Sequence, residues 1–442
     1  MGLDIDSEVV SGRNGFLGAK PKKVSSRNEG LNQGYQLLGH LVLQLFSRRS
    51  RVGYRDAIGL IRMEAEAFDD NLSSLKDSTI FAGKDLLFDL GLLKRKHIIY
   101  ASYLAALSTL PVLSLQHEEF RDGSRAPASK AVFSKVAMAV GTKFMDNIND
   151  DWQSKEDAFE TLGRLPGALI SGFCETNNHV TTPSWLAKAE NSAIEIMSWS
   201  GRLLSSIECQ APFSYPLYKS DVERLIKGQK SSLIGKDWRK RELTLREYIV
   251  KVAEKSTGSL WVDPDICFLE ASIGGFDNRG RREALAIRNS GDLLTKACLL
   301  YDDVVDVLLD LKNNSANAAL IYAAENGIIE RGKAVSMNEN ELIRLFYQSG
   351  VIKDTLDIGD LFLAKAMQSL DLIDTEGERT IDVKGLKYQC NLLRAFNMRK
   401  LVLRDKSVES LKLGLNMREA GEIIKGLPEK VLALEKYVLL PA

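Results

Sequence analysis

Residues 299–311 read LLYDDVVDVLLDL, a stretch with four carboxylates, no basic residue and otherwise only Leu, Val and Tyr. At ~100° per helical residue, Asp302, Asp303, Asp306 and Asp310 fall within about a quarter of the circumference. Like charges four residues apart repel by ~0.2–0.5 kcal/mol per pair, and more where apolar neighbours exclude water. We therefore expect a cation here, and Mg²⁺ prefers oxygen ligands of this kind. The alternative is a solvated face, although such faces usually mix acidic and basic residues.

In chain order, residues 144–152, which read FMDNINDDW, form the first acidic segment, and residues 299–311 form the second. Asp146 and Asp150 project from one helix face, and Asn147 and Asp151 flank it. Alone, this pattern is also typical of a helix end that leads into a polar loop. Two facing carboxylate helices can hold two or three Mg²⁺ ions, whose remaining positions favour water and phosphate oxygens. A diphosphate that bridges such ions loses electron density to them, so its carbon–oxygen bond breaks more easily.

The two segments together resemble the class I isoprenoid synthases, the all-α family of prenyltransferases and terpene cyclases. Asp302, Asp306 and Asp310 match the family's second metal motif, which places ligands at positions one, five and nine. The DDVVD form is also used by chain-elongating members. The first segment looks like the first motif in a DNxxD variant similar to that of large terpene synthases, which cyclise long linear precursors. The resemblance covers about residues 130–320.

This resemblance implies a set of functional residues. The catalytic carboxylates would be Asp146, Asp150, Asp302 and Asp306. Two or three Mg²⁺ ions would be bound by Asp146, Asn147, Asp150, Asp151, Asp302, Asp303, Asp306 and Asp310. Lys255, in a Lys-Ser-Thr sequence, is similar to the diphosphate-binding Lys-Thr element of elongating enzymes. The other diphosphate-binding candidates are Lys312, Arg279, Arg281, Arg282 and the Lys387–Tyr388 pair, which is similar to an Arg-Tyr pair of microbial cyclases.

For several of these residues a plainer interpretation stays open. Arginine forks bind phosphate oxygens well, but the arginines of the 279–282 loop are equally typical of a solvated surface. Asn314 and Asn317 follow the second motif and would either support it or cap a helix.

Two departures from the family favour cyclisation of a single substrate. Elongating enzymes carry a Gly-Gly-Lys-Arg element that binds isopentenyl diphosphate, and residues 82–85 here read AGKD. An Arg-Arg pair after the first motif is replaced by WQSKED. The sequence therefore predicts ionisation of an allylic prenyl diphosphate followed by cyclisation or rearrangement to a terpene. Transfer to isopentenyl diphosphate or another acceptor is the enzymatic alternative, and a non-catalytic α-helical binding protein is the other.

Apolar residues recur at three and four along most of the chain, strand-like alternation is scarce, and no long repeat is present. We expect a flexible tail over residues 1–30 and one all-α domain over 31–442, a helical bundle with a central apolar cavity. Residues 98–116 carry no charge and reach transmembrane length. They contain three Ser, one Thr and Pro111, and no second such segment follows, so they predict a buried helix.

The composition of the chain indicates which partners and which cellular compartment to expect. Lys+Arg and Asp+Glu both number 59, which gives no indication of nucleic-acid binding. Five scattered cysteines without a CxxC pair, and four histidines without ligand spacing, favour a reduced cytoplasmic protein whose metal is held by oxygen. We expect no secretory signal and no myristoylation, because acids occupy the positions that would be basic, Ser or Thr. Peripheral membrane contact through an apolar substrate or product, and a homodimer, are left open.

Overall fold

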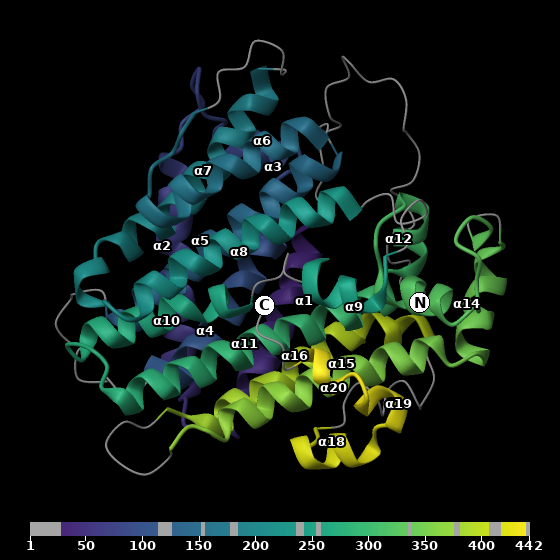
Figure 1. Ribbon diagram of the computed structural model, residues 1–442. Coiled ribbons are helices and arrows are strands. Elements are labelled where there is room, and N and C mark those ends of the chain that lie inside the picture. The colour runs from purple at the N-terminus through teal and green to yellow at the C-terminus, as the bar shows by residue number, and fades with distance from the viewer. Residues whose placement is uncertain are drawn as a thin grey trace.

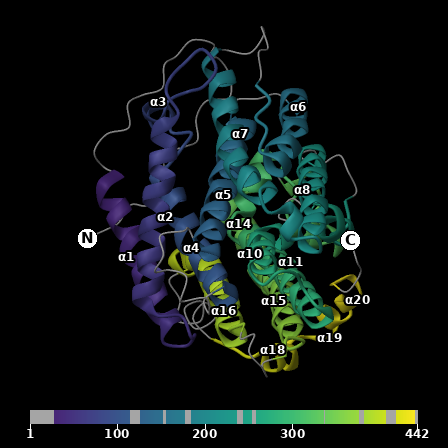
Figure 2. The same ribbon diagram turned by 90° about the vertical axis from the view of Figure 1, so that its left-hand side faces the viewer.

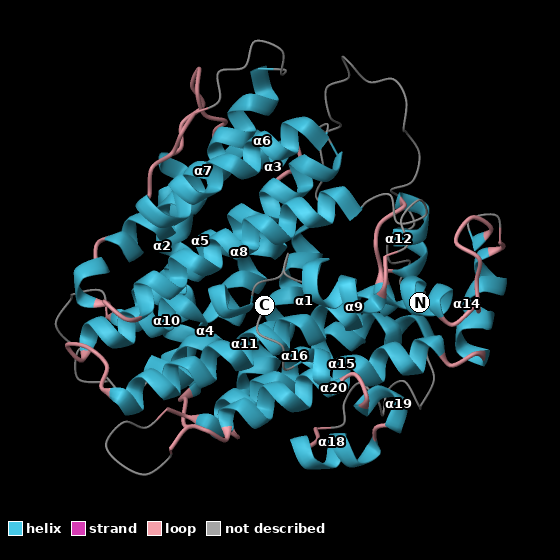
Figure 3. Ribbon diagram, viewed as in Figure 1, coloured by secondary structure: helices cyan, strands magenta, loops and turns pink. Residues whose placement is uncertain are grey.

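The protein is helical throughout the part that the computed structural model describes, which is residues 28–113, 126–151, 155–176, 184–235, 243–252, 258–334, 337–374, 381–405 and 417–438. No strand occurs among these residues (Figure 1), and Figure 3 shows helices joined by short loops. The predicted α class is confirmed. Residues 1–27 of the predicted tail lie outside the described residues, and the first helix already begins at Asn28.

The first half of the bundle consists of α1 (Asn28–Ser47), α2 (Tyr54–Ser74), α3 (Lys84–Asp89), α4 (Arg95–Leu113), α5 (Pro127–Asp151), α6 (Lys155–Pro166), the π-helical turn η2 (Gly167–Ser171), α7 (Ser184–Ser205), the 3₁₀ turn η3 (Glu208–Gln210) and α8 (Ser214–Gly235). The second half consists of α9 (Leu245–Glu247), the π-helical turn η4 (Tyr248–Val252), α10 (Gly258–Ser272), α11 (Asn278–Val305), α12 (Val307–Asn313), α13 (Ala318–Glu325), α14 (Glu339–Gln348), α15 (Val351–Leu370), α16 (Val383–Asp405), α18 (Ala420–Gly426), α19 (Glu429–Leu432) and α20 (Glu435–Val438).

Helix α4 contains most of the uncharged segment of residues 98–116. From Ala101 to Leu113 nearly every residue is buried. The Ser102 and Ser108 hydroxyls donate to carbonyls one turn earlier, and the Thr109 hydroxyl donates to Asp265 of α10 at 2.7 Å. The prediction of a buried helix is confirmed. Across the described residues, no helix has both the length and the apolar character that crossing a membrane requires.

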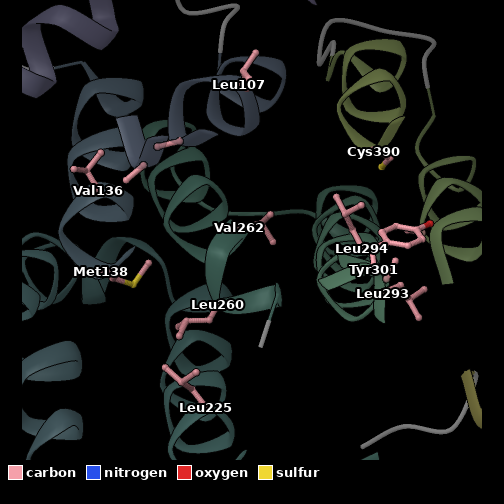
Figure 4. Close-up of a cluster of buried hydrophobic side chains, with 14 of the residues drawn as sticks. Leu107, Val136, Met138, Leu225, Leu260, Val262, Leu293, Leu294, Tyr301 and Cys390 are labelled. Carbon is pink, nitrogen blue, oxygen red and sulfur yellow. The ribbon is translucent and has the colours of Figure 1, made fainter. Parts of the chain in front are cut away.

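Helix α10 lies at the centre of the bundle and packs against α4, α5, α8 and α11. Figure 4 shows apolar side chains from these helices and from α16 filling the space between them, among them Leu107, Val136, Met138, Leu225, Leu260, Val262, Leu293, Leu294, Tyr301 and Cys390. This core also contains charge, because Asp263 and Asp265 of α10 are both buried.

Each of these two aspartates binds a cation from a different neighbouring helix. On the α5 side, the fully buried Lys135 pairs with Asp265 and donates to Ser108 and Thr109 of α4. Burial lowers the pKa of Lys135 and raises that of Asp265, and their mutual attraction opposes both shifts. On the α11 side, Arg288 binds Asp263 at 2.8 Å between Nε and Oδ1.

Close backbone contact orients α11 relative to α10. A Cβ on Gly258, at the start of α10, would lie 2.1 Å from the Gly291 carbonyl oxygen of α11. Only glycine permits this approach. Since Arg288 contacts Asp263 and Gly291 contacts Gly258, α11 advances while α10 recedes, so the two helices are antiparallel.

Helix α8 runs parallel to α11, because Asp221 of α8 pairs with Arg288 and Arg224 pairs with Asp292. Figure 1 shows the two helices side by side, leading toward α12.

The direction of α5 follows from the helix after it. The turn η2 touches the first turns of α8, where the Tyr218 hydroxyl donates to the Leu169 carbonyl. Helix α6 packs along α8, so α6 begins, and α5 ends, toward the C-terminal end of α8. The C-terminal ends of α5, α8 and α11 therefore lie at one end of the bundle.

Lys135→Met should destabilise the protein by about 3–5 kcal/mol, because it leaves Asp265 buried and unpaired. The double variant Lys135→Met/Asp265→Leu should recover most of that loss. Urea unfolding measures both. Lys333→Met is the matched control: it removes the exposed Lys333–Glu330 pair and should change the free energy of unfolding by less than about 1 kcal/mol. An equal loss in Lys135→Met and Lys333→Met would contradict the assigned role.

Candidate functional site

The second acidic segment spans the junction between α11 and α12. The sequence predicted an uninterrupted helix over residues 299–311, whereas α11 ends at Val305 and Asp306 adopts φ −98° and ψ 13°. The backbone N–H of Asp306 still donates to the Asp302 carbonyl at 2.8 Å, and that of Asp310 to the Asp306 carbonyl at 2.9 Å. The three carboxylates therefore still succeed one another a turn apart.

Asp303 faces the protein interior. Its Oδ2 accepts hydrogen bonds from the Tyr248 hydroxyl at 2.7 Å and from the Ala318 backbone N–H at 2.9 Å. The neighbouring Asp302 is exposed. Asp303 was predicted as a metal ligand, but the contacts that the structure shows for it join η4 and α13 to the junction.

Asn317 joins the junction to α13. Its Oδ1 accepts from the N–H groups of Ala319 and Leu320 and so caps the helix. Its Nδ2 donates to the Asp310 carboxylate and to the Asp303 carbonyl, at 2.7 Å each. Both roles considered for Asn317, helix cap and support of the motif, are therefore found in one side chain.

The pKa of the Tyr248 hydroxyl responds to the negative charge of the α11–α12 junction. Burial raises its pKa well above the usual value, and the charges of Asp303, Asp310 and Asp302 raise it further. Three carboxylates thus act on one buried hydroxyl. A cation bound near them would offset the same field.

The first acidic segment forms the last turns of α5. The Asp146 carboxylate is 43% exposed and lies 2.5 Å from Lys143 Nζ. Asn147 Nδ2 donates to the Leu92 carbonyl at 3.1 Å, which fixes α5 to the chain just before α4. The backbone of Asp150 and Asp151 belongs to α5, and their side chains lie outside the described residues.

A basic cluster lies beside this first segment, made of Lys94, Lys96 and Lys143. All three act on His97, whose pKa is lowered to about 4 by burial first and then by these charges. The sequence analysis did not single out this cluster. A signal was available in the run KRKH at 94–97, directly before the uncharged helix.

The two acidic segments lie toward the same end of the bundle. Asp146 follows Lys135 by eleven residues, and Asp302 follows Arg288 by fourteen. Lys135 and Arg288 bind neighbouring positions of α10, so they mark one level. At 1.5 Å per helical residue, Asp146 and Asp302 lie about 16 and 21 Å beyond it in the same direction.

Arg279, Arg281 and Arg282 were predicted to bind diphosphate, and the structure places them far from Asp302. They lie near the start of α11, at least twenty residues before Asp302 in one helix. That separation is about 30 Å or more. Arg279 instead pairs with Glu283 and Asp374, and the Arg281 guanidinium lies over the Phe213 ring.

Lys387 and Tyr388 also lie away from Asp302. Lys387 pairs with Asp371, directly after α15. The nearby Ser369 hydroxyl accepts from Asn289 of α11, thirteen residues and hence about 20 Å before Asp302. Tyr388 packs against Phe46 and Arg49. Their role in binding diphosphate therefore stays a prediction.

The other two lysines that were predicted to bind diphosphate are Lys312 and Lys255. Lys312 lies on α12, two residues beyond Asp310, where its Nζ is 2.6 Å from Glu339 Oε1. Lys255 lies outside the described residues. On either side of it, Tyr248 and Gly258 both contact α11.

No group of three His, Cys, Asp or Glu side chains close enough to hold a metal ion occurs in the described part of the chain. That part excludes the side chains of Asp150 and Asp151. A scan against models of known protein families and a search of curated proteins both find no match for this chain.

Substitution of Asp303 should lower the free energy of unfolding far more than substitution of Asp302. Asp303→Ala should destabilise the protein by about 2–4 kcal/mol, because two buried donors lose their acceptor. Asp302→Ala should change stability by less than about 0.5 kcal/mol, as expected for an exposed site. Urea unfolding without Mg²⁺ measures both. Equal losses in the two variants would show that the structural role is not confined to Asp303.

His97 should titrate near pH 4 by NMR, with the signal assigned through His97→Gln. In the unfolded chain its pKa is about 6.5, so the unfolded state binds the proton first as pH falls. The contribution of neutral His97 to stability is therefore complete above pH 6.5 and is lost between pH 6.5 and 4. Lys143→Gln should raise the pKa of His97, whereas Lys333→Gln should not. An unchanged pKa of His97 in Lys143→Gln would show that the charge of Lys143 does not act on His97.

Proposed function

We propose that the protein catalyses Mg²⁺-dependent ionisation of an allylic prenyl diphosphate, with release of diphosphate and capture of the carbocation inside the bundle. One observation carries most of this proposal: the two acidic segments lie toward the same end of the helices that α10 holds in register. Oxygen donors from two helices at one end are the ligand type that Mg²⁺ prefers.

The residues at that end fit the binding of a metal–diphosphate complex. Asp302 and Asp146 are accessible, whereas Asp303 and Asp310 brace the junction through Tyr248, Ala318 and Asn317. Bound Mg²⁺ would neutralise the charge that develops on the leaving diphosphate. The basic cluster of Lys94, Lys96 and Lys143 would attract the same anion from the α4–α5 side.

The fate of the carbocation forms the second part of the proposal. Capture within the same molecule gives a cyclic or rearranged terpene, and it needs an apolar space that excludes water. The central cavity and the class I isoprenoid synthase fold stay part of this proposal. Aromatic ring faces would stabilise the cation.

Transfer of the prenyl group to a second diphosphate substrate is a second candidate. The sequence argued against it because only Lys84 stood where a second anion site was expected. Lys84 lies 2.6 Å from Asp69 and 3.1 Å from the Ser73 hydroxyl, so its charge is already compensated. The basic cluster lies close to the first acidic segment, and its Lys94, Lys96 and Lys143 all act on His97, although Lys143 also pairs with Asp146. This observation favours retaining isopentenyl diphosphate as an acceptor.

The test is incubation of the purified protein with all-trans C10 to C35 diphosphates, with and without Mg²⁺ and isopentenyl diphosphate. Diphosphate release and mass spectrometry are the readouts. We expect Mg²⁺-dependent release from a single allylic substrate, lost in Asp302→Asn. The matched control, Arg282→Gln at the far end of α11, should retain activity.

Each alternative has a distinct result. A product longer by five carbons, formed only with isopentenyl diphosphate, would assign the protein as a prenyltransferase. Neither release nor a Mg²⁺-dependent thermal shift with diphosphate would assign it as a non-catalytic binding protein.

A further inference from the structure

Helix α1 presents a row of leucines to solvent. Leu37, Leu41 and Leu45 are 62%, 50% and 47% exposed. Their spacing of four residues places them on one helix face. Figure 2 shows α1 at the edge of the molecule, outside α2 and α4.

The opposite face of α1 is firmly packed. Leu43 and Phe46 are fully buried. Gly39 lies so close to the Tyr103 ring that a Cβ would be 2.8 Å from it. The leucine row is therefore not a core surface turned outward by a loosely attached helix. It is a second apolar face on a helix whose first face is already satisfied.

Positive charge surrounds this row. Arg48 continues it at nearly the same helical angle, and Arg48, Arg49, Arg51 and Arg55 are all exposed, with no acidic residue from 48 to 55. In the sequence before α1, residues 13–27 contain five Lys and Arg and no Asp or Glu. The whole chain has a formal net charge of zero. The segments that precede and follow α1 in the sequence are therefore more basic than the chain as a whole.

An anionic lipid surface complements this arrangement better than a second copy of the chain. An amphipathic helix can lie in the membrane interface with its apolar face at the boundary between headgroups and acyl chains, and Lys and Arg next to such a helix are attracted to anionic headgroups. Two α1 helices in parallel contact would bring the arginines after α1 together, where like charges repel.

We propose that α1 binds the surface of anionic bilayers, with Leu37, Leu41 and Leu45 inserted at the interface and Arg48 and Arg51 contacting lipid headgroups. The helix lies on the membrane and does not span it. The inference is independent of the proposed reaction, since it rests on exposure and charge at α1 alone.

The experiment is sedimentation of the full-length protein with vesicles of phosphatidylcholine alone or with one quarter phosphatidylserine. We expect binding to the anionic vesicles that weakens as salt is raised. Leu37→Gln/Leu41→Gln/Leu45→Gln should lower the partition coefficient about tenfold or more. Arg48→Gln/Arg51→Gln should lower binding to the anionic vesicles. The matched control is Leu372→Gln, a 74% exposed leucine after α15, which should bind normally.

Several results would overturn the proposal: absence of binding, equal binding to both vesicle types, or unchanged binding by the triple leucine variant with native circular dichroism. Light scattering supplies the remaining alternative. A dimer that the triple variant abolishes would show that a second copy covers the leucine row.

Discussion

The paired charges on α10 constrain everything else in the bundle. Asp265 holds Lys135 of α5, and Asp263 holds Arg288 of α11, in a core where an unpaired charge costs several kcal/mol. Apolar packing tolerates a shift of a helix by one turn far better than a buried ion pair does, because leucines are interchangeable and ion-pair partners are not. The two pairs therefore select one register for α5 and α11, and that register brings both acidic segments to the same end.

At that end, neighbouring acids have separate tasks because a helix turns by about 100° per residue. Asp303 turns inward to Tyr248 and the start of α13, and Asp302 turns outward. A carboxylate with two buried donors already has a folding role, whereas the Asp302 carboxylate is exposed to solvent. The inward contacts hold the backbone in place, so the outward carboxylate is presented on a rigid support.

Periodicity predicted the helices well, since the three- and four-residue repeats of apolar residues survive in the packed structure. Contacts between distant residues were less accessible. The sequence predicted that Arg282 and Asp302 serve the same diphosphate, but one continuous helix separates them by about 30 Å. Conversely, Lys94 and Lys143 are far apart in sequence, and the charges of both lower the pKa of His97 because α4 begins where α5 ends. The partner of Asp303, Tyr248, lies 55 residues away. Local pattern therefore located the acidic segments but not the groups around them.

The balance of charge over the whole chain conceals strong segregation. Carboxylates are concentrated at the α11–α12 junction, the lysines of the basic cluster lie at the start of α4 and on α5, and arginines follow α1 in the sequence. Under the proposed function this segregation has a mechanistic consequence. The junction alone would repel a diphosphate, since two unit charges 4 Å apart interact by about 4 kcal/mol at an effective dielectric near 20. Mg²⁺ would therefore have to bind before the diphosphate or together with it. The lysines of the basic cluster would attract the anion without any metal. Substrate and metal would then enter as one complex. The basic cluster would attract the diphosphate first, and Asp302 would then bind the Mg²⁺ ions of the complex.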